Sequence, residues 1–178
     1  MTPDPAFAVW ITGLPASGKS TLARALAEEL AGRGTRVCIL ESDALRKILT
    51  PAPTYDEEER DTFYGAVAHF AGILAAHGVP VVIDATGNRR AYRDRARGRI
   101  PNFLEVYVEC PLPVCLARDP KGIYRRGIEG TASDVPGLTA VYEPPLRPDL
   151  VVRGDREDPA AAARTIVEIL AARGFLKA

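Results

Sequence analysis

Residues 13–20 read Gly-Leu-Pro-Ala-Ser-Gly-Lys-Ser and match the phosphate-binding loop pattern G-x-x-x-x-G-K-[S/T] at every fixed position. The apolar run Phe7-Ala-Val-Trp-Ile11 precedes this loop and is typical of a buried strand. Leu22, Leu26 and Leu30 follow it at helical spacing, which predicts a helix with one apolar face. A strand, a glycine-rich loop and a helix in this order predict a site whose backbone N–H groups bind the phosphates of a nucleoside triphosphate.

The side chains of this loop predict how ATP and Mg²⁺ bind. We expect the ammonium of Lys19 to bridge the β- and γ-phosphates and the hydroxyl of Ser20 to ligate Mg²⁺. Thr21 is the candidate donor to the α-phosphate. The other candidates belong to the loop itself, whose backbone surrounds the phosphates: Gly13, Ala16, Ser17 and Gly18. A purely structural turn has no need of a lysine followed by a serine, so we favour nucleotide binding.

The length and charge of the chain limit its class. Its 178 residues predict a single domain, 1–178. Basic and acidic residues each number 23, whereas proteins that bind duplex nucleic acid usually carry a basic excess. No apolar run is long enough for a membrane span and the first residues lack a signal-peptide pattern, so we expect a cytoplasmic protein without nucleic-acid or membrane partners. Cys38, Cys110 and Cys115 are scattered, which favours buried thiols over a metal site.

Short apolar strands alternate with helices along the chain. The predicted strands are Phe7–Thr12, Arg36–Glu41, Val79–Asp84, Phe103–Glu109 and Asp149–Arg153. The predicted helices are Lys19–Ala31, Asp43–Leu49, Asp56–His77, Arg89–Arg97, Pro113–Arg118 and Pro159–Arg173. In the long third helix, Phe63, Val67, Phe70 and Leu74 are expected to pack on the sheet. This alternation predicts a three-layer α/β fold of the P-loop NTPase type, a five-stranded parallel sheet with helices on both faces.

Polar residues follow the second and third predicted strands, where ligands of such folds bind. Asp43 is the candidate carboxylate that orients an attacking hydroxyl, and Arg46, three residues later, is the candidate partner of an anionic group on the acceptor. A helix cap formed by Ser42 or Asp43 is the structural alternative. Asp84 is the candidate that holds Mg²⁺ directly or through water, with a turn-forming aspartate as its alternative.

A basic stretch follows the third strand. Arg89 and Arg90 lie nearest the strand end, and Arg89 is a candidate for substrate binding. Arg89, Arg93 and Arg97 share one helical face, and for most arginines of the stretch we expect a solvated face paired with acidic residues.

Residues 118–148 are rich in glycine, proline and charge and predict a mobile lid. Closure of a lid excludes water, which would otherwise accept the γ-phosphoryl group. Arg118 and Lys121 are candidates to bring positive charge to the phosphates, and the guanidinium of Arg118 is also suited to stack on adenine. The catalytic candidates are therefore Lys19, Asp43 and Lys121.

The chain resembles the adenylylsulfate kinase (APS kinase) family in the phosphate loop and in three narrower stretches: Glu109-Cys-Pro-Leu-Pro-Val-Cys-Leu-Ala-Arg-Asp-Pro-Lys-Gly-Ile-Tyr124, Tyr142-Glu-Pro-Pro145 and Pro148-Asp-Leu150. The resemblance implies transfer of the γ-phosphoryl of ATP to the 3′-hydroxyl of adenylyl sulfate, with Mg²⁺, giving PAPS and ADP. It implies that Asp43 lies by this hydroxyl and that Arg46 and Arg60 contact the acceptor. It also implies that Arg118 and Lys121 bind ATP, and family members often form homodimers.

The acceptor side differs from the usual family pattern. Glu41-Ser-Asp-Ala44 stands where the family usually has Asp-Gly-Asp-Asn, and Val135-Pro-Gly-Leu138 stands where its lid usually carries a phenylalanine followed by Thr-Gly-Ile. The alternative is therefore a kinase of the same fold that acts on another hydroxyl, on a nucleotide-linked metabolite, a sugar or a polynucleotide 5′-end. A nucleotide-switched binding protein such as a GTPase is disfavoured, because the sequence has no Asn-Lys-x-Asp stretch.

Overall fold

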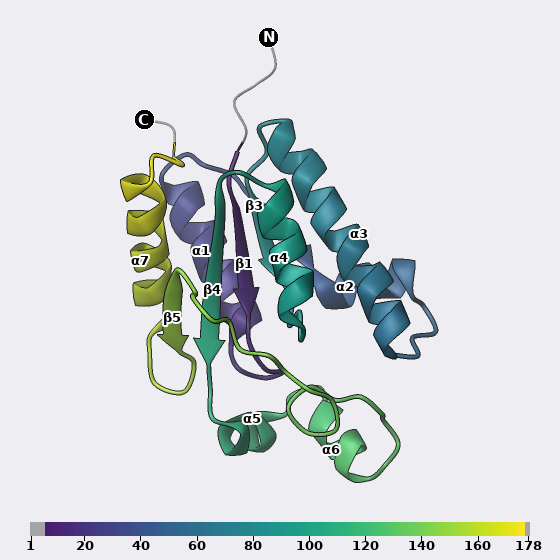
Figure 1. Ribbon diagram of the computed structural model, residues 1–178. Helices are drawn as coiled ribbons and strands as arrows, with labels where there is room; N and C mark the ends of the chain where they lie inside the picture. The colour runs from purple at the N-terminus through teal and green to yellow at the C-terminus, as the bar shows by residue number, and fades with distance from the viewer. Residues whose placement is uncertain (1–5, 177–178) are drawn as a thin grey trace.

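A computed structural model describes residues 6–176, and its centre is a five-stranded parallel sheet (Figure 1). The strand order is β2-β3-β1-β4-β5, so β1, which precedes the phosphate loop, is the middle strand. All five predicted strands are present, with these bounds: β1 Ala8–Thr12, β2 Cys38–Glu41, β3 Val81–Asp84, β4 Phe103–Glu109 and β5 Leu150–Arg153. The predicted α/β class and the parallel five-stranded sheet are confirmed.

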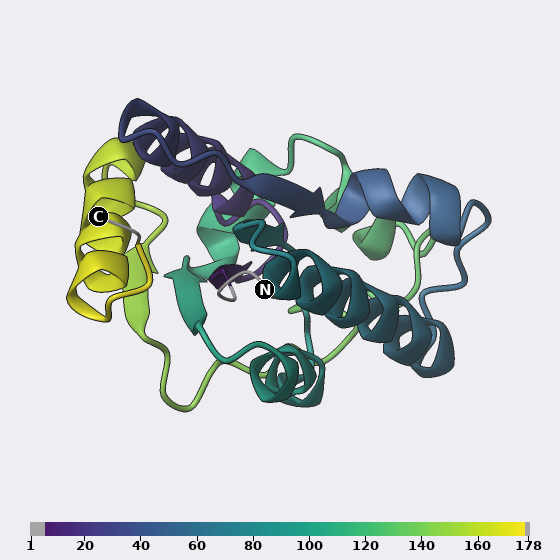
Figure 2. The same ribbon diagram turned by 90° about the horizontal axis from the view of Figure 1, so that it is seen from above.

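Helices cover both faces of the sheet, as expected for a three-layer fold (Figure 2). Their bounds are α1 Lys19–Gly32, α2 Ser42–Leu49, α3 Glu57–Ala76, α4 Arg90–Arg99, α5 Leu112–Arg118, α6 Ile123–Ile128 and α7 Pro159–Ala172. Helix α6 was not predicted, because its six residues lie in the glycine- and charge-rich lid. Along residues 6–176 no helix has the length and apolar character that crossing a membrane requires.

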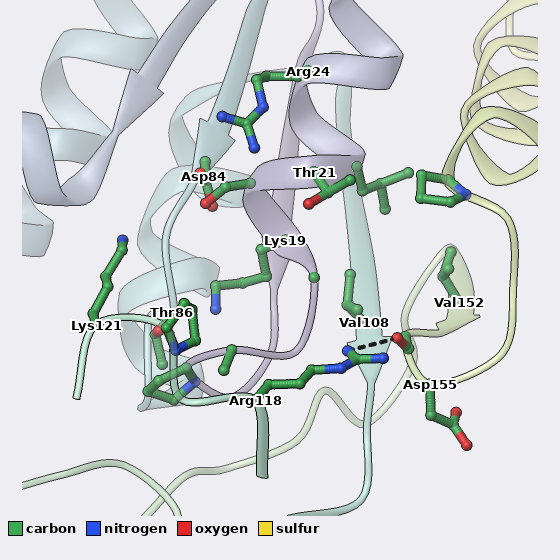
Figure 3. Close-up of a pocket in the computed structure, with 18 of the residues that line it drawn as sticks. Lys19, Thr21, Arg24, Asp84, Thr86, Val108, Arg118, Lys121, Val152 and Asp155 are labelled. Carbon is green, nitrogen blue, oxygen red and sulfur yellow. Dashed lines mark hydrogen bonds between the residues drawn. The ribbon is translucent and has the colours of Figure 1, made fainter. Parts of the chain in front are cut away.

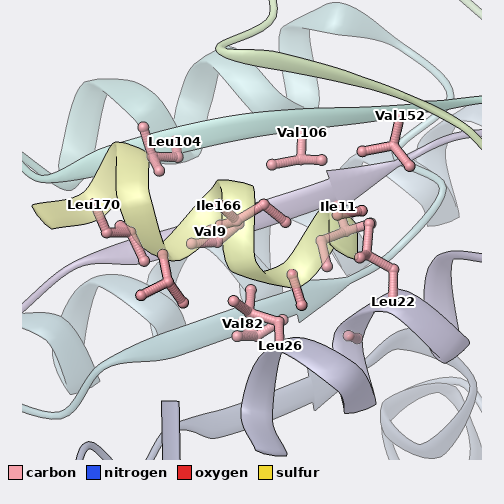
Figure 4. Packing of buried hydrophobic residues seen from close by; sticks show 14 of the residues in the cluster. Val9, Ile11, Leu22, Leu26, Val82, Leu104, Val106, Val152, Ile166 and Leu170 are labelled. Atoms are coloured by element: carbon pink, nitrogen blue, oxygen red, sulfur yellow. The ribbon is translucent and has the colours of Figure 1, made fainter. Parts of the chain in front are cut away.

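The face of the sheet under α1 and α7 holds one apolar core. Val9 and Ile11 project from β1 to this face and pack among Leu22 and Leu26 of α1 and Ile166 of α7 (Figure 4). Full burial of each such side chain stabilises the fold by about 1.5–3 kcal/mol. The predicted apolar stripe of α1 therefore fixes the helix that begins at the phosphate loop against the central strands.

The opposite face packs against α3 and α4, and here one prediction is wrong. Phe63 and Val67 of α3 are buried as expected, but Phe70 is 38% exposed. The buried stripe of α3 continues instead through small alanines, Ala68 and Ala71, which let the helix approach the sheet closely. Leu74 is partly buried against the same core, so Phe70 alone of the four predicted residues departs from the buried side.

The chain leaves β4 at the carboxyl end of the sheet, passes through α5 and enters the lid, which carries α6 (Figure 1). Three contacts join the lid to the phosphate loop region: the hydroxyl of Tyr124 donates to the carbonyl of Pro15 (2.9 Å), the hydroxyls of Tyr142 and Thr12 are hydrogen-bonded (3.0 Å), and Gly137 packs on Leu14. A Cβ at position 137 would lie 2.6 Å from a terminal carbon of the Leu14 side chain, and the φ of +85° at this position favours glycine. The mobility of the lid remains a prediction.

Candidate active site

The loop between β1 and α1 adopts a geometry that its glycines allow. A Cβ on Gly13 would lie 2.5 Å from the carbonyl oxygen of Val108, so a larger residue would push the loop away from β4. Gly18 has a φ of +109° and precedes the first turn of α1. Glycine adopts this backbone conformation at little cost, which leaves the N-terminus of α1 open toward the loop. The local sequence therefore places the free N–H groups of the helix where an anion binds.

Lys19 lies over the loop rather than in solvent. Its side chain is 9% exposed and its Nζ donates a hydrogen bond to the carbonyl of Leu14 (2.8 Å). Burial lowers the pKa of Lys19 to about 8, and the carboxylates of Asp84 and Asp43 only partly offset this effect. A triphosphate in the loop would restore a full counter-charge to this ammonium.

A cleft of about 840 Å³ opens beside the loop (Figure 3). Its lining includes most of the sequence candidates: Ala16, Gly18, Lys19, Ser20, Thr21, Asp43, Asp84, Arg118 and Lys121. Gly13 and Ser17 do not line it. Ser17 is fully buried, so its predicted contact with nucleotide stays a prediction.

One end of the cleft is suited to a nucleobase. Val108 of β4 and Val152 of β5 supply apolar walls, and Arg118 reaches across to donate a hydrogen bond to the carbonyl of Gly154 (2.9 Å) (Figure 3). A guanidinium held in this way presents a flat cationic surface, on which an aromatic base stacks favourably. Gly154 approaches the loop so closely that a Cβ on it would lie 2.1 Å from the carbonyl oxygen of Ser17. Sequence reasoning did not single out this glycine.

The other end of the cleft is acidic. Glu41 and Asp84 are neighbours in register at the ends of β2 and β3, and Asp43 follows in the first turn of α2. Among residues 6–176 no group of three histidine, cysteine, aspartate or glutamate side chains forms a metal site by itself. Asp84 and Ser20 nevertheless line the same cleft, and two oxygen ligands fit Mg²⁺, which keeps waters and takes substrate phosphates as its other ligands.

Asp43 and Lys121 form an ion pair that joins α2 to the lid across the cleft. Partial burial lowers the pKa of Lys121, but the hydrogen bond and the charge of Asp43 outweigh it, so the pKa is raised overall. The capping alternative for Ser42 and Asp43 is wrong: α2 begins at Ser42, Glu41 is its N-cap residue, and no side chain caps it. Two of the three catalytic candidates are thus in direct contact.

Arg46 and Arg60 lie outside the lining of this cleft. Arg46 is 9% exposed, pairs with Glu59 (2.9 Å) and stacks 4.0 Å from the ring centre of Phe63. The Nε of Arg60 donates to the carbonyl of Tyr55 (2.7 Å), and its Nη2 donates to the carbonyl of Asp134 in the lid. The structure therefore brings both arginines together, beside α3 and the lid and not in the cleft.

Tyr55 is a residue that sequence reasoning missed. Its φ is +60°, a conformation that costs energy for any residue with a side chain, and its ring is partly exposed beside Arg46 (4.9 Å) and Arg60 (6.0 Å). The sequence signal was weak, because an aromatic residue in a polar loop before a helix does not show its backbone conformation.

Arg89 also lies outside the cleft. It pairs with Glu143 and Glu57 at 3.3 Å each and lines a separate hollow between α3 and α4. The solvated face expected for this stretch is wrong for Arg93, which is 1% exposed and pairs with Glu105 (2.6 Å). Arg93 also donates to the carbonyls of Gly87 and Glu143, so it ties the loop after β3 to the end of the lid.

Comparisons with known proteins agree with this geometry. The model of the adenylylsulphate kinase family matches residues 5–153. An adenylyl-sulfate kinase of Deinococcus deserti is 42% identical over 83% of this chain and 82% of its own length, and one of Gloeothece citriformis is 36% identical over 95% and 96%. The solved structure of Mycobacterium tuberculosis APS kinase in complex with AMPPNP and APS superposes with a TM-score of 0.88, at 30% identity over 95% of this chain and 99% of that one.

Proposed function

The chain belongs to the adenylylsulphate kinase family, and on that premise we propose that it transfers the γ-phosphoryl group of ATP to the 3′-hydroxyl of adenylyl sulfate. The products are PAPS and ADP, a step of sulfate assimilation. The observation that carries the proposal is a single cleft that contains the loop of residues 13–20, the ion pair between Asp43 and Lys121, and Arg118. Loop, carboxylate and lid cation are the parts that phosphoryl transfer to a hydroxyl requires.

ATP binding follows from the two ends of the cleft. The backbone of the loop and the N-terminus of α1 bind the phosphates, and Lys19 exchanges its hydrogen bond with Leu14 for phosphate oxygens. Arg118 stacks on the adenine that Val108 and Val152 flank. Thr21 donates to the α-phosphate. Ser20 and Asp84 would hold Mg²⁺, which would supply positive charge to the β- and γ-phosphates.

The acceptor hydroxyl is oriented by Asp43. In phosphoryl transfer the oxygen of this hydroxyl forms a bond to phosphorus as the bond to the β-phosphate oxygen breaks, and the hydroxyl proton passes to the carboxylate. Asp43 is engaged by Lys121 in the structure, so this step requires that the ammonium move onto the phosphates. The negative phosphates of ATP provide a new partner for the ammonium of Lys121. The carboxylate of Asp43 is then free to accept the hydroxyl proton when both substrates are bound.

Acceptor roles for Arg46, Arg60 and Arg89 remain predictions. The contacts of Arg60 with Asp134 and of Arg89 with Glu143 link them to the lid, so a movement of the lid would change the surroundings of both guanidinium groups. Tyr55, whose ring lies beside Arg46 and Arg60, joins this set of candidates. A homodimer and a cytoplasmic location also remain predictions, and light scattering of the purified protein tests the first.

The direct test is release of ADP from ATP and Mg²⁺ in the presence of adenylyl sulfate. We expect turnover that depends on adenylyl sulfate and yields PAPS by chromatography. A panel of other hydroxyl acceptors, namely sugars, nucleotide-linked metabolites and a polynucleotide with a free 5′-hydroxyl, is assayed in parallel. Faster turnover with one of these than with adenylyl sulfate would show that the protein is a kinase with a different acceptor.

A further inference from the structure

The loop that follows β3 is held at four consecutive backbone carbonyls by donors from three other parts of the chain. For Ala85, Thr86, Gly87 and Asn88 in turn, the donors are the indole of Trp10 (2.9 Å), the hydroxyl of Thr12 (2.6 Å), the guanidinium of Arg93 and the backbone N–H of Glu143 (2.8 Å). The first two donors belong to β1, the third to α4 and the fourth to the end of the lid. The conformation of residues 85–88 therefore depends on these surrounding elements as well as on its own sequence.

This loop borders the cleft. It begins directly after Asp84, the proposed magnesium ligand, and Thr86 within it lines the cleft (Figure 3). A shift of residues 85–88 therefore moves both groups relative to the phosphate loop. Phosphoryl transfer depends mainly on the alignment of the reacting groups, and a misplacement of about 1 Å lowers a rate by as much as about 10²-fold.

The end of the lid is fastened to this loop on both sides of Tyr142. The backbone carbonyl of Asn88 accepts from the N–H of Glu143, and the side-chain Nδ2 of Asn88 donates to the carbonyl of Val141 (3.0 Å). Arg93 adds a hydrogen bond to the carbonyl of Glu143 (2.7 Å). The backbone on either side of Tyr142 is thus fixed, which directs its ring toward the end of β1.

The hydroxyl of Tyr142 is the donor in its contact with Thr12. The two oxygens lie 3.0 Å apart, and the single hydroxyl proton of Thr12 is already donated to the carbonyl of Thr86. Burial raises the pKa of Tyr142, and the hydrogen bond with Thr12 only partly offsets this, so the phenol keeps its proton. A directed chain of hydrogen bonds therefore runs from the lid through the last residue of β1 to the loop that borders the cleft.

We infer that Tyr142 is a positioning residue, which couples the seated end of the lid to residues 85–88 and so aligns the cleft for transfer. Tyr142 itself lies outside the cleft lining, so it acts through Thr12 and Thr86. The kinetic consequence rests on the proposed function, whereas the effect on the loop does not.

Trp10 provides a readout of this loop that does not depend on activity. It is the single tryptophan of the chain, it is fully buried, and its indole N–H donates to the carbonyl of Ala85. Tyr142→Phe removes the hydroxyl but keeps the ring. We expect the indole N–H to exchange with solvent about fivefold faster or more in this variant, as measured by NMR, because the loop is less firmly held.

Tyr107→Phe is the matched control. Tyr107 stacks on Tyr142 (ring centres 6.2 Å apart), and its hydroxyl takes no part in this chain of hydrogen bonds. Indole exchange in the control should equal that of the wild type. Thermal melting of both variants separates local loosening of the loop from a loss of global stability.

Steady-state kinetics tests the functional consequence. Tyr142→Phe and Thr12→Val should each lower kcat by about fivefold or more and leave KM for ATP within about twofold, while Thr12→Ser, which keeps the hydroxyl, should recover most of kcat. Because Thr12 links the other two residues, Tyr142→Phe should have no further effect in the Thr12→Val background. Additive losses would mean that the two residues act independently and would overturn the coupling.

Wild-type indole exchange in Tyr142→Phe overturns the inference, whatever the rate of turnover. Faster indole exchange with an unchanged kcat would also overturn it, because the loop would then move without affecting transfer. Wild-type protein that phosphorylates none of the acceptors tested would instead contradict the proposed function. In that case the indole exchange of Tyr142→Phe still decides whether Tyr142 holds the loop.

Discussion

At the scale of single residues, Lys19 is buried and donates a hydrogen bond to the carbonyl of Leu14 in its own loop. Lys19→Ala removes the cation that neutralises charge on the transferring phosphoryl group, so we expect kcat to fall on the order of 10²-fold or more. The carbonyl of Leu14 loses its partner, but no apolar core contact is removed, and the fold should persist. ADP release gives the rate, and circular dichroism with thermal melting checks the fold. Normal turnover by the variant would exclude the phosphate-loop role.

The lowered pKa of Lys19 predicts a pH-dependent uptake of protons. Its pKa of about 8 in the empty site means that the ammonium loses its proton as pH rises through that value. Bound triphosphate raises the pKa again, so ATP binding near pH 9 should take up as much as about one proton, and binding near pH 6.5 almost none. Calorimetry in buffers of different ionisation enthalpy measures this number. Equal uptake at both pH values in wild type, or an undiminished uptake in Lys19→Ala, would assign the titration to another group.

A substitution of Asp43 distinguishes a catalytic role of its carboxylate from a role in the ion pair with Lys121 alone. Asp43→Asn keeps the shape of the side chain but removes the proton acceptor, so kcat should fall by about 10²-fold or more. Lys121 loses its partner in the same variant, and its pKa should move down toward its ordinary value. Rapid-quench measurement of the transfer step tests the first effect. Retention of the wild-type rate would leave Asp43 with only the contact to Lys121.

At the scale of helices, α3 carries two phenylalanines that differ in burial. Phe63 is 1% exposed, so Phe63→Ala should lower the free energy of unfolding by about 3–5 kcal/mol. Phe70 lies on the solvent side, so Phe70→Ala should change it by less than about 0.5 kcal/mol. Urea denaturation of both variants measures the difference. A large loss for Phe70→Ala would mean that another surface covers this residue in solution.

The lid carries a prediction about motion. Lys121 and Arg118, which are held by Asp43 and Gly154 in the structure, become ligands of ATP in the proposed mechanism. Amide hydrogen exchange across residues 118–148 should therefore slow when ATP and Mg²⁺ are added, with the larger change near Lys121. Helix α7, outside the lid, serves as the internal reference. Exchange in the lid that does not respond to nucleotide would contradict a mobile closing segment.

At the scale of the whole molecule, the fold followed from patterns that are local in sequence. Apolar runs and the loop of residues 13–20 were sufficient to predict the five strands, six of the seven helices within residues 6–176, and a cleft beside the loop. The partners of the arginines were harder to predict from the sequence. The guanidinium groups of Arg46, Arg60 and Arg93 find partners 13, 74 and 12 residues away in the chain, and helical spacing contains no information about such partners.

The close approach of Gly154 to Ser17 has a consequence for synthesis on the ribosome. The loop is made early, yet its underside is braced by a turn that follows the last strand, and the apolar stripe of α1 is covered by α7. A nascent chain that has not yet reached Leu150 therefore exposes that stripe and cannot hold the loop in its final shape. We therefore expect nascent chains that lack β5 and α7 to bind nucleotide poorly and to expose the leucines of α1.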